Sequence, residues 1–192
     1  MNGGVLGIAG SPRRHGNSEQ LLDACLSGVR EAGGEAVKLV VRDYGIQPCE
    51  GCHACSEDGE CVLRDRMHEI YPMLDGAEAV VVASPLFFAT VPAVLKALYD
   101  RCQPYWARRY VLKQQPGPKR PGALLVAGGG GDPFGAEGAV LTTRSVFAVL
   151  RVEYAHELVV KGVDSPADIG RRTEDLARAG RIGAALAGAR SG

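Results

Sequence analysis

One stretch near the start of the chain indicates the architecture: Val5-Leu6-Gly7-Ile8-Ala9-Gly10-Ser11-Pro12-Arg13-Arg14-His15-Gly16-Asn17-Ser18. Its first five residues form an apolar run that ends at Gly10-Ser11-Pro12, which is typical of a strand buried on both faces. From Ser18 onward, apolar residues recur at helical spacing until Gly33-Gly34. A buried strand that leads through a short turn into a helix predicts the first unit of an α/β protein.

The same alternation continues along the chain. Further apolar runs predict strands at residues 36–41, 79–84, 123–127 and 157–163, and helical patterns lie at 66–74, 92–102, 141–150 and from 168 onward. The Pro-rich segment 103–121 is expected to be a loop. Right-handed crossovers between parallel strands place helices on both faces of the sheet. We therefore expect one domain, residues 1–192, with a flavodoxin-like, doubly wound five-stranded parallel sheet of order 2-1-3-4-5 and a cysteine-rich loop insertion at 47–65.

The charge balance excludes some classes of partner. Lys plus Arg and Asp plus Glu both total 22, so no net positive field attracts nucleic acid or an anionic membrane. No apolar run approaches the roughly 20 residues of a membrane-spanning helix. The chain begins with Met-Asn-Gly-Gly, without a basic segment followed by an apolar one, so a cytoplasmic protein is expected.

The turn at residues 10–18, called the phosphate loop below, is suited to bind an anion. It joins a strand to a helix, so its backbone N–H groups and the positive end of the helix point beyond the sheet edge. Gly16-Asn17-Ser18 lacks the lysine of a nucleotide-hydrolysing P-loop, and there is no G-x-G-x-x-G. Candidate ligands for a terminal monophosphate such as that of FMN are Ser11, Arg13, Asn17 and Ser18. The alternative is an ordinary strand-to-helix turn.

Two other loops are expected at the same edge, because they follow the third and fourth strands. After the third strand, Pro85, Leu86, Phe87 and Phe88 offer backbone amides and aromatic rings that suit a flat isoalloxazine. The alternative for the phenylalanines is packing in the core. After the fourth strand, Gly128, Gly129 and Gly130 would let the backbone approach the ring closely, or would form only a mobile turn.

Four cysteines, Cys49, Cys52, Cys55 and Cys61, lie in a C-x2-C-x2-C-x5-C pattern. Compact spacing of this kind is typical of iron–sulfur ligands, and Gly59 allows the chain to turn back toward the fourth sulfur. Alternatives are a structural zinc ion, disulfides in an oxidising compartment, and a metal-free loop of free or oxidised thiols. Cys25 and Cys102 lie in apolar helical patterns and are expected to be small buried side chains.

With these motifs together, the chain resembles the iron-sulfur flavoproteins of the NAD(P)H-dependent FMN reductase family, in the flavodoxin-like superfamily. The resemblance is carried by the phosphate loop, the cysteine motif with Asp65 and Met67, the segment 85–92, and Leu95 through Arg101. It implies FMN and a nearby 4Fe-4S cluster ligated by the four cysteines of the motif. It also implies homodimers or homotetramers with the flavin near an interface. Phe87 stands where relatives commonly have tyrosine, so no hydroxyl is available at this position.

The leading functional hypothesis is an FMN-dependent oxidoreductase. FMN exchanges two electrons and a cluster exchanges single electrons, so the protein would couple partners of both kinds, such as NAD(P)H, ferredoxin or a quinone. No Ser-His-Asp or paired-carboxylate motif stands out, so no catalytic acid or base residue is predicted. One alternative is an NAD(P)H-dependent FMN or quinone reductase whose cysteine loop is structural or cluster-free. Another is a redox-sensing or electron-carrier module without turnover of its own.

Overall fold

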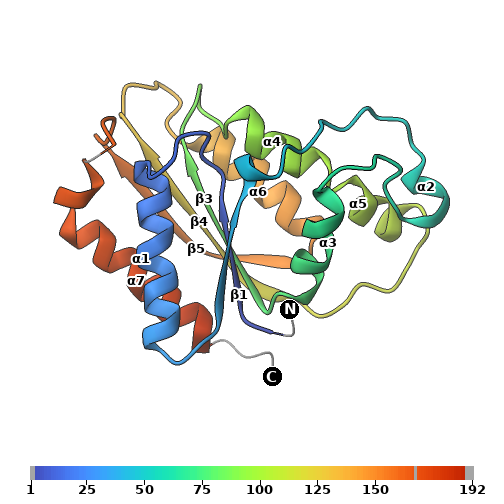
Figure 1. The fold of residues 1–192 in the computed structure, drawn as a ribbon, viewed down its shortest axis with the longest axis horizontal. Coiled ribbons are helices and arrows are strands. Elements are labelled where there is room, and N and C mark those ends of the chain that lie inside the picture. Colours follow the sequence, from blue (N-terminus) through green and yellow to red (C-terminus); the bar gives the residue numbers. More distant parts are fainter. Residues whose placement is uncertain (1–2, 167, 189–192) are drawn as a thin grey trace.

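A computed structural model gives the structure of the protein and describes residues 3–166 and 168–188. Five parallel strands form one sheet in the order β2-β1-β3-β4-β5, as predicted (Figure 1). The strands are β1 Val5–Ala9, β2 Ala36–Val40, β3 Ala79–Pro85, β4 Arg120–Gly128 and β5 Val152–Lys161. The reversal of strand order lies between β1 and β3, where a doubly wound sheet leaves a crevice at the carboxyl ends of its strands.

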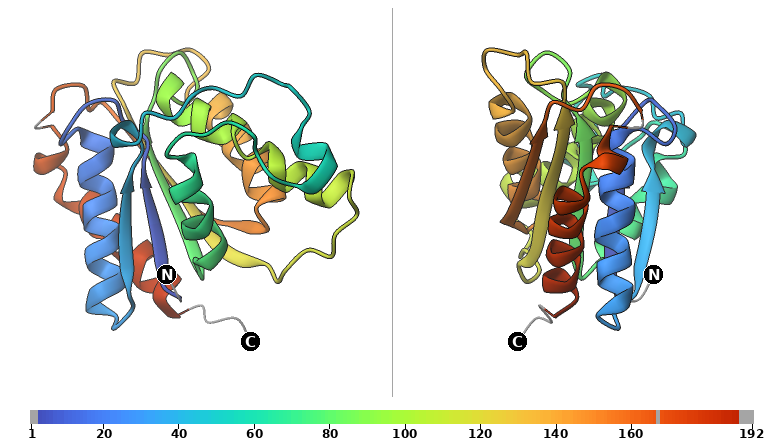
Figure 2. Two further views of the ribbon diagram at one scale, coloured as in Figure 1. Left: turned by 45° about the vertical axis from the view of Figure 1, so that its right-hand side comes forward. Right: turned by 90° about the vertical axis from the view of Figure 1, so that its left-hand side faces the viewer.

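Helices cover both faces of this sheet (Figure 2). One face carries α1 Asn17–Glu31 and α7 Thr173–Gly188, and the other carries α3 Met67–Gly76, α4 Ala93–Asp100 and α6 Glu137–Val149. The shorter elements are η1 Val41–Asp43, α2 Cys55–Asp58, α5 Gln103–Tyr110 and η2 Ile169–Arg171. Figure 1 shows α2 and α5 side by side, beyond α3 and away from the sheet. None of the helices in the described ranges is both long and apolar enough to cross a lipid bilayer.

The two faces have separate hydrophobic cores. Leu6 and Ile8 of β1 pack into the core beneath α3, α4 and α6, whereas Val5 and Ala9 pack into the core beneath α1 and α7. Successive side chains of a strand point to opposite faces, so a strand in the middle of such a sheet must be apolar at every position. The continuous apolar runs in the sequence reflect this double coverage.

The two helices on one face approach each other closely. A Cβ atom on Gly183 of α7 would lie 1.8 Å from the carbonyl oxygen of Cys25 in α1, so only glycine allows this approach. The α7 helix begins at Thr173, after the short turn η2, rather than at Asp168 as predicted. The turn η2, which precedes α7, lies beside the start of α1, which matters for the candidate site.

Two other predicted segments also have wrong bounds. Segment 103–121 is not only a loop, because its first part is helix α5 and its last part already belongs to β4. Pro104 lies in the first turn of α5, where its missing N–H has no helical partner to lose. Strand β5 begins at Val152 rather than at Glu157. It is an edge strand, and Glu153, Ala155 and Glu157 are exposed along it, so this part lacks a continuous apolar run.

Candidate functional site

The loops after β1, β3 and β4 meet at the carboxyl edge of the sheet, at the top of Figure 1. The backbone N–H of Gly10 donates to the carbonyl of Ala83 at 2.8 Å, and that of Leu86 donates to the carbonyl of Ala127 at 3.0 Å. These hydrogen bonds continue the sheet ladder to its last residues. The expectation that the three loops share one edge is confirmed.

The side chains of the phosphate loop differ in the hydrogen bonds that they already make within the protein. Ser11 Oγ accepts from the backbone N–H of Arg13 at 3.0 Å and donates to its carbonyl at 3.1 Å, so it shapes the turn. Ser18 is 2% exposed, and in the described part of the chain its hydroxyl has no hydrogen-bond partner. The guanidinium of Arg13 donates to the carbonyl of Asp164 at 3.1 Å. Ser11 is thus engaged in shaping the turn, and Ser18 is the second hydroxyl that the sequence predicts as a phosphate ligand.

Asn17 is bound to the segment after β5. Its Nδ2 donates to the carbonyl of Ser165 at 3.0 Å, and its Oδ1 accepts from the backbone N–H of Ile169 at 3.2 Å. The Asp168 carboxylate in turn accepts from the backbone N–H groups of Asp164 and Ser165. The Asn17 side chain is therefore occupied, which leaves its backbone N–H for an anion. Sequence reasoning did not place residues 164–166 and 168 here; Ser165 and Asp168, spaced as in a helix cap, were the available signal.

A buried carboxylate braces the phosphate loop from the side of β2. Glu19 is 3% exposed and accepts from the backbone N–H of His15 at 3.0 Å, from Arg42 Nη1 at 3.0 Å and from Lys38 Nζ at 2.9 Å. Arg42 Nη1 also donates to the carbonyls of Ser11 at 3.2 Å and Arg13 at 3.3 Å. The loop's carbonyls are thus engaged by a cation that is itself held by Glu19.

This network determines the ionisation of Glu19. Burial by itself raises the pKa of the carboxyl group, but the hydrogen bonds from Arg42 and Lys38 outweigh it and lower the pKa from 4.5 to about 2. Glu19 is therefore charged at neutral pH. Sequence reasoning missed all three residues, because the lysine and the arginine lie on β2 and η1 and meet Glu19 only in the folded chain.

The segment after β3 forms a tight turn in a strained conformation. The backbone N–H of Phe87 donates to the carbonyl of Thr90 at 2.9 Å, and the reverse bond is 3.1 Å. Between them, Phe88 and Ala89 have φ angles of 49° and 62°, a left-handed region that normally favours glycine or asparagine. Phe87 is 44% exposed and Phe88 is 97% exposed. Neither ring is buried in the core, so the core-packing alternative is wrong.

The glycine-rich turn after β4 lies beside this segment. A Cβ on Gly128 would approach the Cβ of Leu86 to 3.0 Å, and Gly130 has a φ of 88°. Gly129 lies next to Asp164: a Cβ atom on Gly129 would lie 3.8 Å from the Cβ of Asp164. Pro85 and Leu86 are half-buried. The structure therefore explains Gly128 and Gly130 by packing and by backbone conformation, and the approach of a flavin ring to this turn stays a prediction.

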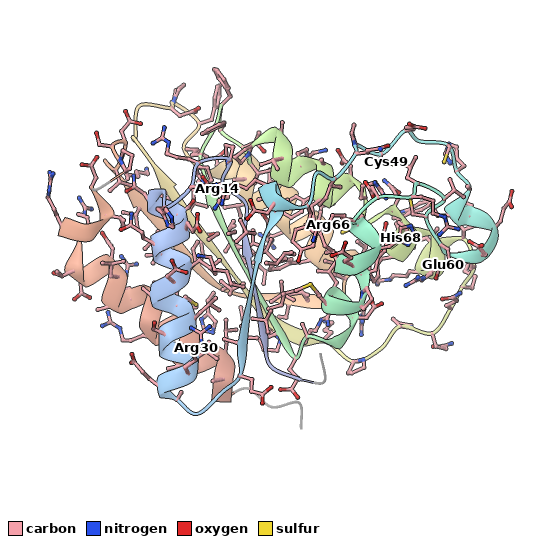
Figure 3. All side chains as sticks on the ribbon, in the orientation of Figure 1. Arg14, Arg30, Cys49, Glu60, Arg66 and His68 are labelled. Atoms are coloured by element: carbon pink, nitrogen blue, oxygen red, sulfur yellow. The ribbon has the colours of Figure 1, made fainter. Side chains whose placement is uncertain are left out.

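The cysteine loop, residues 47–65, lies on the side of the molecule opposite to α1 and α7, on the right of Figure 3, where Cys49 and Glu60 are labelled. All six cysteines of the chain are unpaired, so disulfides are absent from the fold. Gly59 has a φ of 84° and ends α2, as the turn toward the fourth cysteine requires. The four cysteines of the motif line one cavity of about 340 Å³, together with residues of α5 such as Pro104 and Trp106. The spacing has therefore brought four thiols to one place.

The two ends of the cysteine loop are fastened together. The Asp65 carboxylate accepts from the backbone N–H of Gln47 at 2.8 Å and from Arg101 Nη1 at 2.7 Å. Arg101 also donates to the carbonyl of Gln47 at 3.0 Å. Farther along the loop, Arg108 of α5 donates to the carbonyl of Gly59 at 2.9 Å. Sequence reasoning included Asp65 and Arg101 only as part of a resemblance, without this role.

The structure does not gather the four thiols around one ion. Around a tetrahedral zinc the sulfurs would lie roughly 3.8 Å apart, from a Zn–S distance of about 2.3 Å. Among residues 3–166 and 168–188, no three His, Cys, Asp or Glu side chains converge closely enough to hold a single ion. Burial raises the pKa of Cys55, and the neighbouring thiols Cys49 and Cys61 raise it further. A cationic group bound among these thiols would relieve that repulsion.

The sequence of the chain matches a known protein family. Residues 4–162 match the family model described as NADPH-dependent FMN reductase. The chain belongs to the NADPH-dependent FMN reductase family. It is therefore a flavin-dependent oxidoreductase of an FMN-binding family, and the three loops at the carboxyl edge of its sheet lie within the matched residues.

Relatives of this reductase family member include archaeal proteins named iron-sulfur flavoprotein. One from Archaeoglobus fulgidus is 35% identical over 183 residues, which cover 95% of this chain and 78% of the relative. Another from Methanosarcina thermophila is 35% identical over 125 residues, covering 65% of this chain and 63% of the relative. The resemblance noted from the sequence motifs is thus confirmed at the level of the family.

Solved structures share the fold of this reductase. An NAD(P)H:quinone oxidoreductase from Methanothermobacter marburgensis superposes with a TM-score of 0.69 at 21% identity, covering 97% of this chain and all (100%) of the other. An FMN-dependent NADH-azoreductase from Bacillus anthracis, solved in complex with FMN, gives 0.63 at 17% identity, covering 97% and 98%. Both confirm the flavodoxin-like architecture.

Proposed function

We propose that this reductase family member holds FMN at the loops after β1, β3 and β4, and a 4Fe-4S cluster at Cys49, Cys52, Cys55 and Cys61. In this proposal it transfers electrons between a two-electron partner and a one-electron partner. The observation that carries the proposal is that the four thiols of the motif line a single cavity, in a chain whose relatives are named iron-sulfur flavoproteins.

The chain's own residues would seat the flavin as follows. The backbone N–H groups of the phosphate loop, the hydroxyl of Ser18 and the guanidinium of Arg13 would bind the phosphate, while Glu19 and Arg42 hold the loop in shape. The ring would be bordered by Pro85, Leu86, Phe87, Phe88, Gly128, Gly129 and Gly130. Bound FMN supplies hydride and radical chemistry, so the protein's part is to bind and orient it.

The cluster is tested first by metal analysis. Protein purified and reconstituted without oxygen should contain about four iron atoms per subunit, as the proposed 4Fe-4S cluster requires. Cys52→Ala should lose the iron and keep FMN, because the two sites use different loops. Cys25→Ala is the matched control, since this thiol is buried in the core and should affect neither cofactor. Bound zinc in place of iron would overturn the cluster assignment.

The flavin seat is tested by separating FMN from riboflavin, which lacks the phosphate. Ser18→Ala should weaken FMN binding about tenfold, because a hydrogen bond to a charged group contributes about 1.5 kcal/mol or more. Riboflavin affinity should not change. Ser27→Ala, an exposed position in the same helix, is the control. Equal losses for both ligands would show that Ser18 does not contact the phosphate.

A second candidate function is an NAD(P)H-dependent FMN or quinone reductase whose cysteine loop is structural or cluster-free. The family description names NADPH as the donor, and the structurally similar archaeal protein is named a quinone oxidoreductase. This alternative predicts that iron-free protein with FMN oxidises NAD(P)H at the rate of the iron-loaded protein. If only loaded protein exchanges electrons with ferredoxin, the first function is supported.

We also propose that the subunits associate as a homodimer or homotetramer. Phe88 is 97% exposed, Phe134 is 70% exposed and Leu141 is 66% exposed, and they lie on the loops after β3 and β4 and on the adjoining helix α6. Large apolar side chains gathered at one end of a fold are commonly covered by another chain. Light scattering of the FMN-loaded protein would give the subunit count, and a monomer at micromolar concentration would contradict the proposal.

A further inference from the structure

Arg101, at the end of α4, is a buried cation with one unsatisfied donor. Its side chain is 0% exposed. Its Nη1 donates to Asp65 and to the carbonyl of Gln47, and its Nη2 donates to Asp65 at 3.0 Å and to the carbonyl of Leu63 at 3.5 Å. Its Nε is buried and has no hydrogen-bond partner. A buried N–H of a charged group without an acceptor is costly, so such an atom calls for an explanation.

The surroundings of Arg101 suggest the missing acceptor. Arg101 lines the same cavity of about 340 Å³ as the four cysteines of the motif. Neutral thiols accept hydrogen bonds weakly, whereas thiolate and sulfide sulfurs carry negative charge and accept them well. A loaded cysteine site would therefore bring strong acceptors into the cavity that the buried Arg101 helps to line.

We propose that Arg101 is a positioning residue for the cysteine site, whose Nε–H donates to a sulfur of the bound cluster or of its thiolate ligands. Its two Nη groups at the same time hold the ends of the cysteine loop together through Gln47, Leu63 and Asp65. This inference rests on the proposed function, because it requires the cluster. It adds to that function a residue that sets the reduction potential.

The charge of the cysteine site determines whether Arg101 raises or lowers its reduction potential. Reduction adds one negative charge to the cysteine site, and a buried hydrogen-bond donor stabilises the more negative state. The Asp65 carboxylate partly offsets the positive charge of Arg101, so the Nε–H dipole is the specific contribution. Removing this donor should lower the reduction potential, and removing the Asp65 charge should raise it.

Lysine at position 101 separates these contributions. A lysine keeps the positive charge beside Asp65, but its single ammonium group cannot reproduce the planar fork of five N–H donors. Arg101→Lys should therefore bind iron to the wild-type level. Its one-electron equilibrium should shift about tenfold toward the oxidised cluster, which corresponds to about 59 mV in the negative direction. Iron release to a chelator should also be faster.

The matched control is Arg108→Lys. Arg108 also donates to the cysteine loop, but it is partly exposed, and its Nε is satisfied by the carbonyl of Gly59 while its Nη2 donates to Glu60. Its potential should stay at the wild-type value. Both variants are compared by iron analysis and by a spectroscopic redox titration of the reconstituted, FMN-loaded protein.

The outcomes are distinct. An Arg101→Lys potential equal to that of Arg108→Lys overturns the role of Arg101. If Arg101→Lys does not fold, Asp65→Asn carries the test: a raised potential supports the inference, and an unchanged or lowered one overturns it. A wild-type protein that takes up no iron under the same conditions contradicts the proposed function itself, and the inference about Arg101 with it.

Discussion

Replacing Glu19 with glutamine tests whether a buried charge holds the phosphate loop. In the structure, the carboxylate accepts from the backbone N–H of His15 and pairs with Arg42 and Lys38. The glutamine oxygen can keep the bond from His15, but it removes the charge between two cations. Arg42 would still have the carbonyls of Ser11 and Arg13 as acceptors, so the loop should loosen rather than unfold.

The magnitude follows from the pKa of Glu19. A shift from 4.5 to about 2 corresponds to at most about 3 kcal/mol of stabilisation at neutral pH. Lys38 is 25% exposed and keeps Asp23 as a partner at 2.7 Å, so solvent screens part of this. We expect Glu19→Gln to lower the free energy of unfolding by about 2 kcal/mol, or the melting temperature by about 4–8 °C.

The pH dependence provides the sharper readout. The pKa of Glu19 is lower in the folded state than in the unfolded state, so its stabilisation is complete above about pH 4.5. It is lost progressively as the pH falls toward 2, because the folded protein must then be protonated as well. The difference between wild type and Glu19→Gln should be constant from pH 5 to pH 7 and should shrink below pH 4.5.

Thermal unfolding of metal-free protein across this pH range measures both quantities. Asp23→Asn is the control, because it removes an exposed carboxylate from the same lysine and should cost less than about 0.5 kcal/mol. The reasoning is refuted if the two variants are equally stable at pH 7. It is also refuted if the effect of Glu19→Gln is the same at pH 3 as at pH 7.

Two further predictions concern the thiols and the strained turn. Burial raises the pKa of Cys25 and of Cys102 to about 12, and both side chains are at most 2% exposed, so neither thiol should react in the folded protein. Iodoacetamide at pH 8 should therefore add four groups to native metal-free protein, as measured by intact mass. Six adducts without unfolding would contradict this. Ala89→Gly should raise the free energy of unfolding by about 0.5–1 kcal/mol in a urea titration, because glycine adopts the φ of 62° without strain. In the same titration, the control Ala148→Gly, at an exposed position in α6, should lower the free energy of unfolding by about 1 kcal/mol.

The central part of the fold could be predicted because its signal is local. In β1 and β3, burial on both faces requires an apolar residue at every position, and this shows directly as a run in the sequence. This signal is missing from the first half of β5. An edge strand pairs on one side only, so an exposed polar residue such as Glu153 is compatible with it, and the part of β5 before residue 157 shows no apolar run.

The candidate site divides in the same way. The phosphate loop and the cysteine motif could be recognised, because each is one continuous segment whose residue types suit one chemistry. The residues that support them could not be. Arg42 reaches Glu19 across 23 positions, and Arg101 reaches Asp65 across 36. The sequence around an arginine does not indicate which distant carboxylate it will pair with in the folded protein.

Periodicity, turn residues and cysteine spacing therefore established the strands, the anion-binding turn and the thiol cluster, since each depends on neighbours within a few positions of the chain. Only the tertiary structure decided which distant groups complete these features. Asn17 meets Ile169 across 152 positions because α1 and α7 pack together on one face of the sheet. The physical reason is that a buried polar group must find its partner wherever the packing of the apolar core brings one, and that packing belongs to the whole chain.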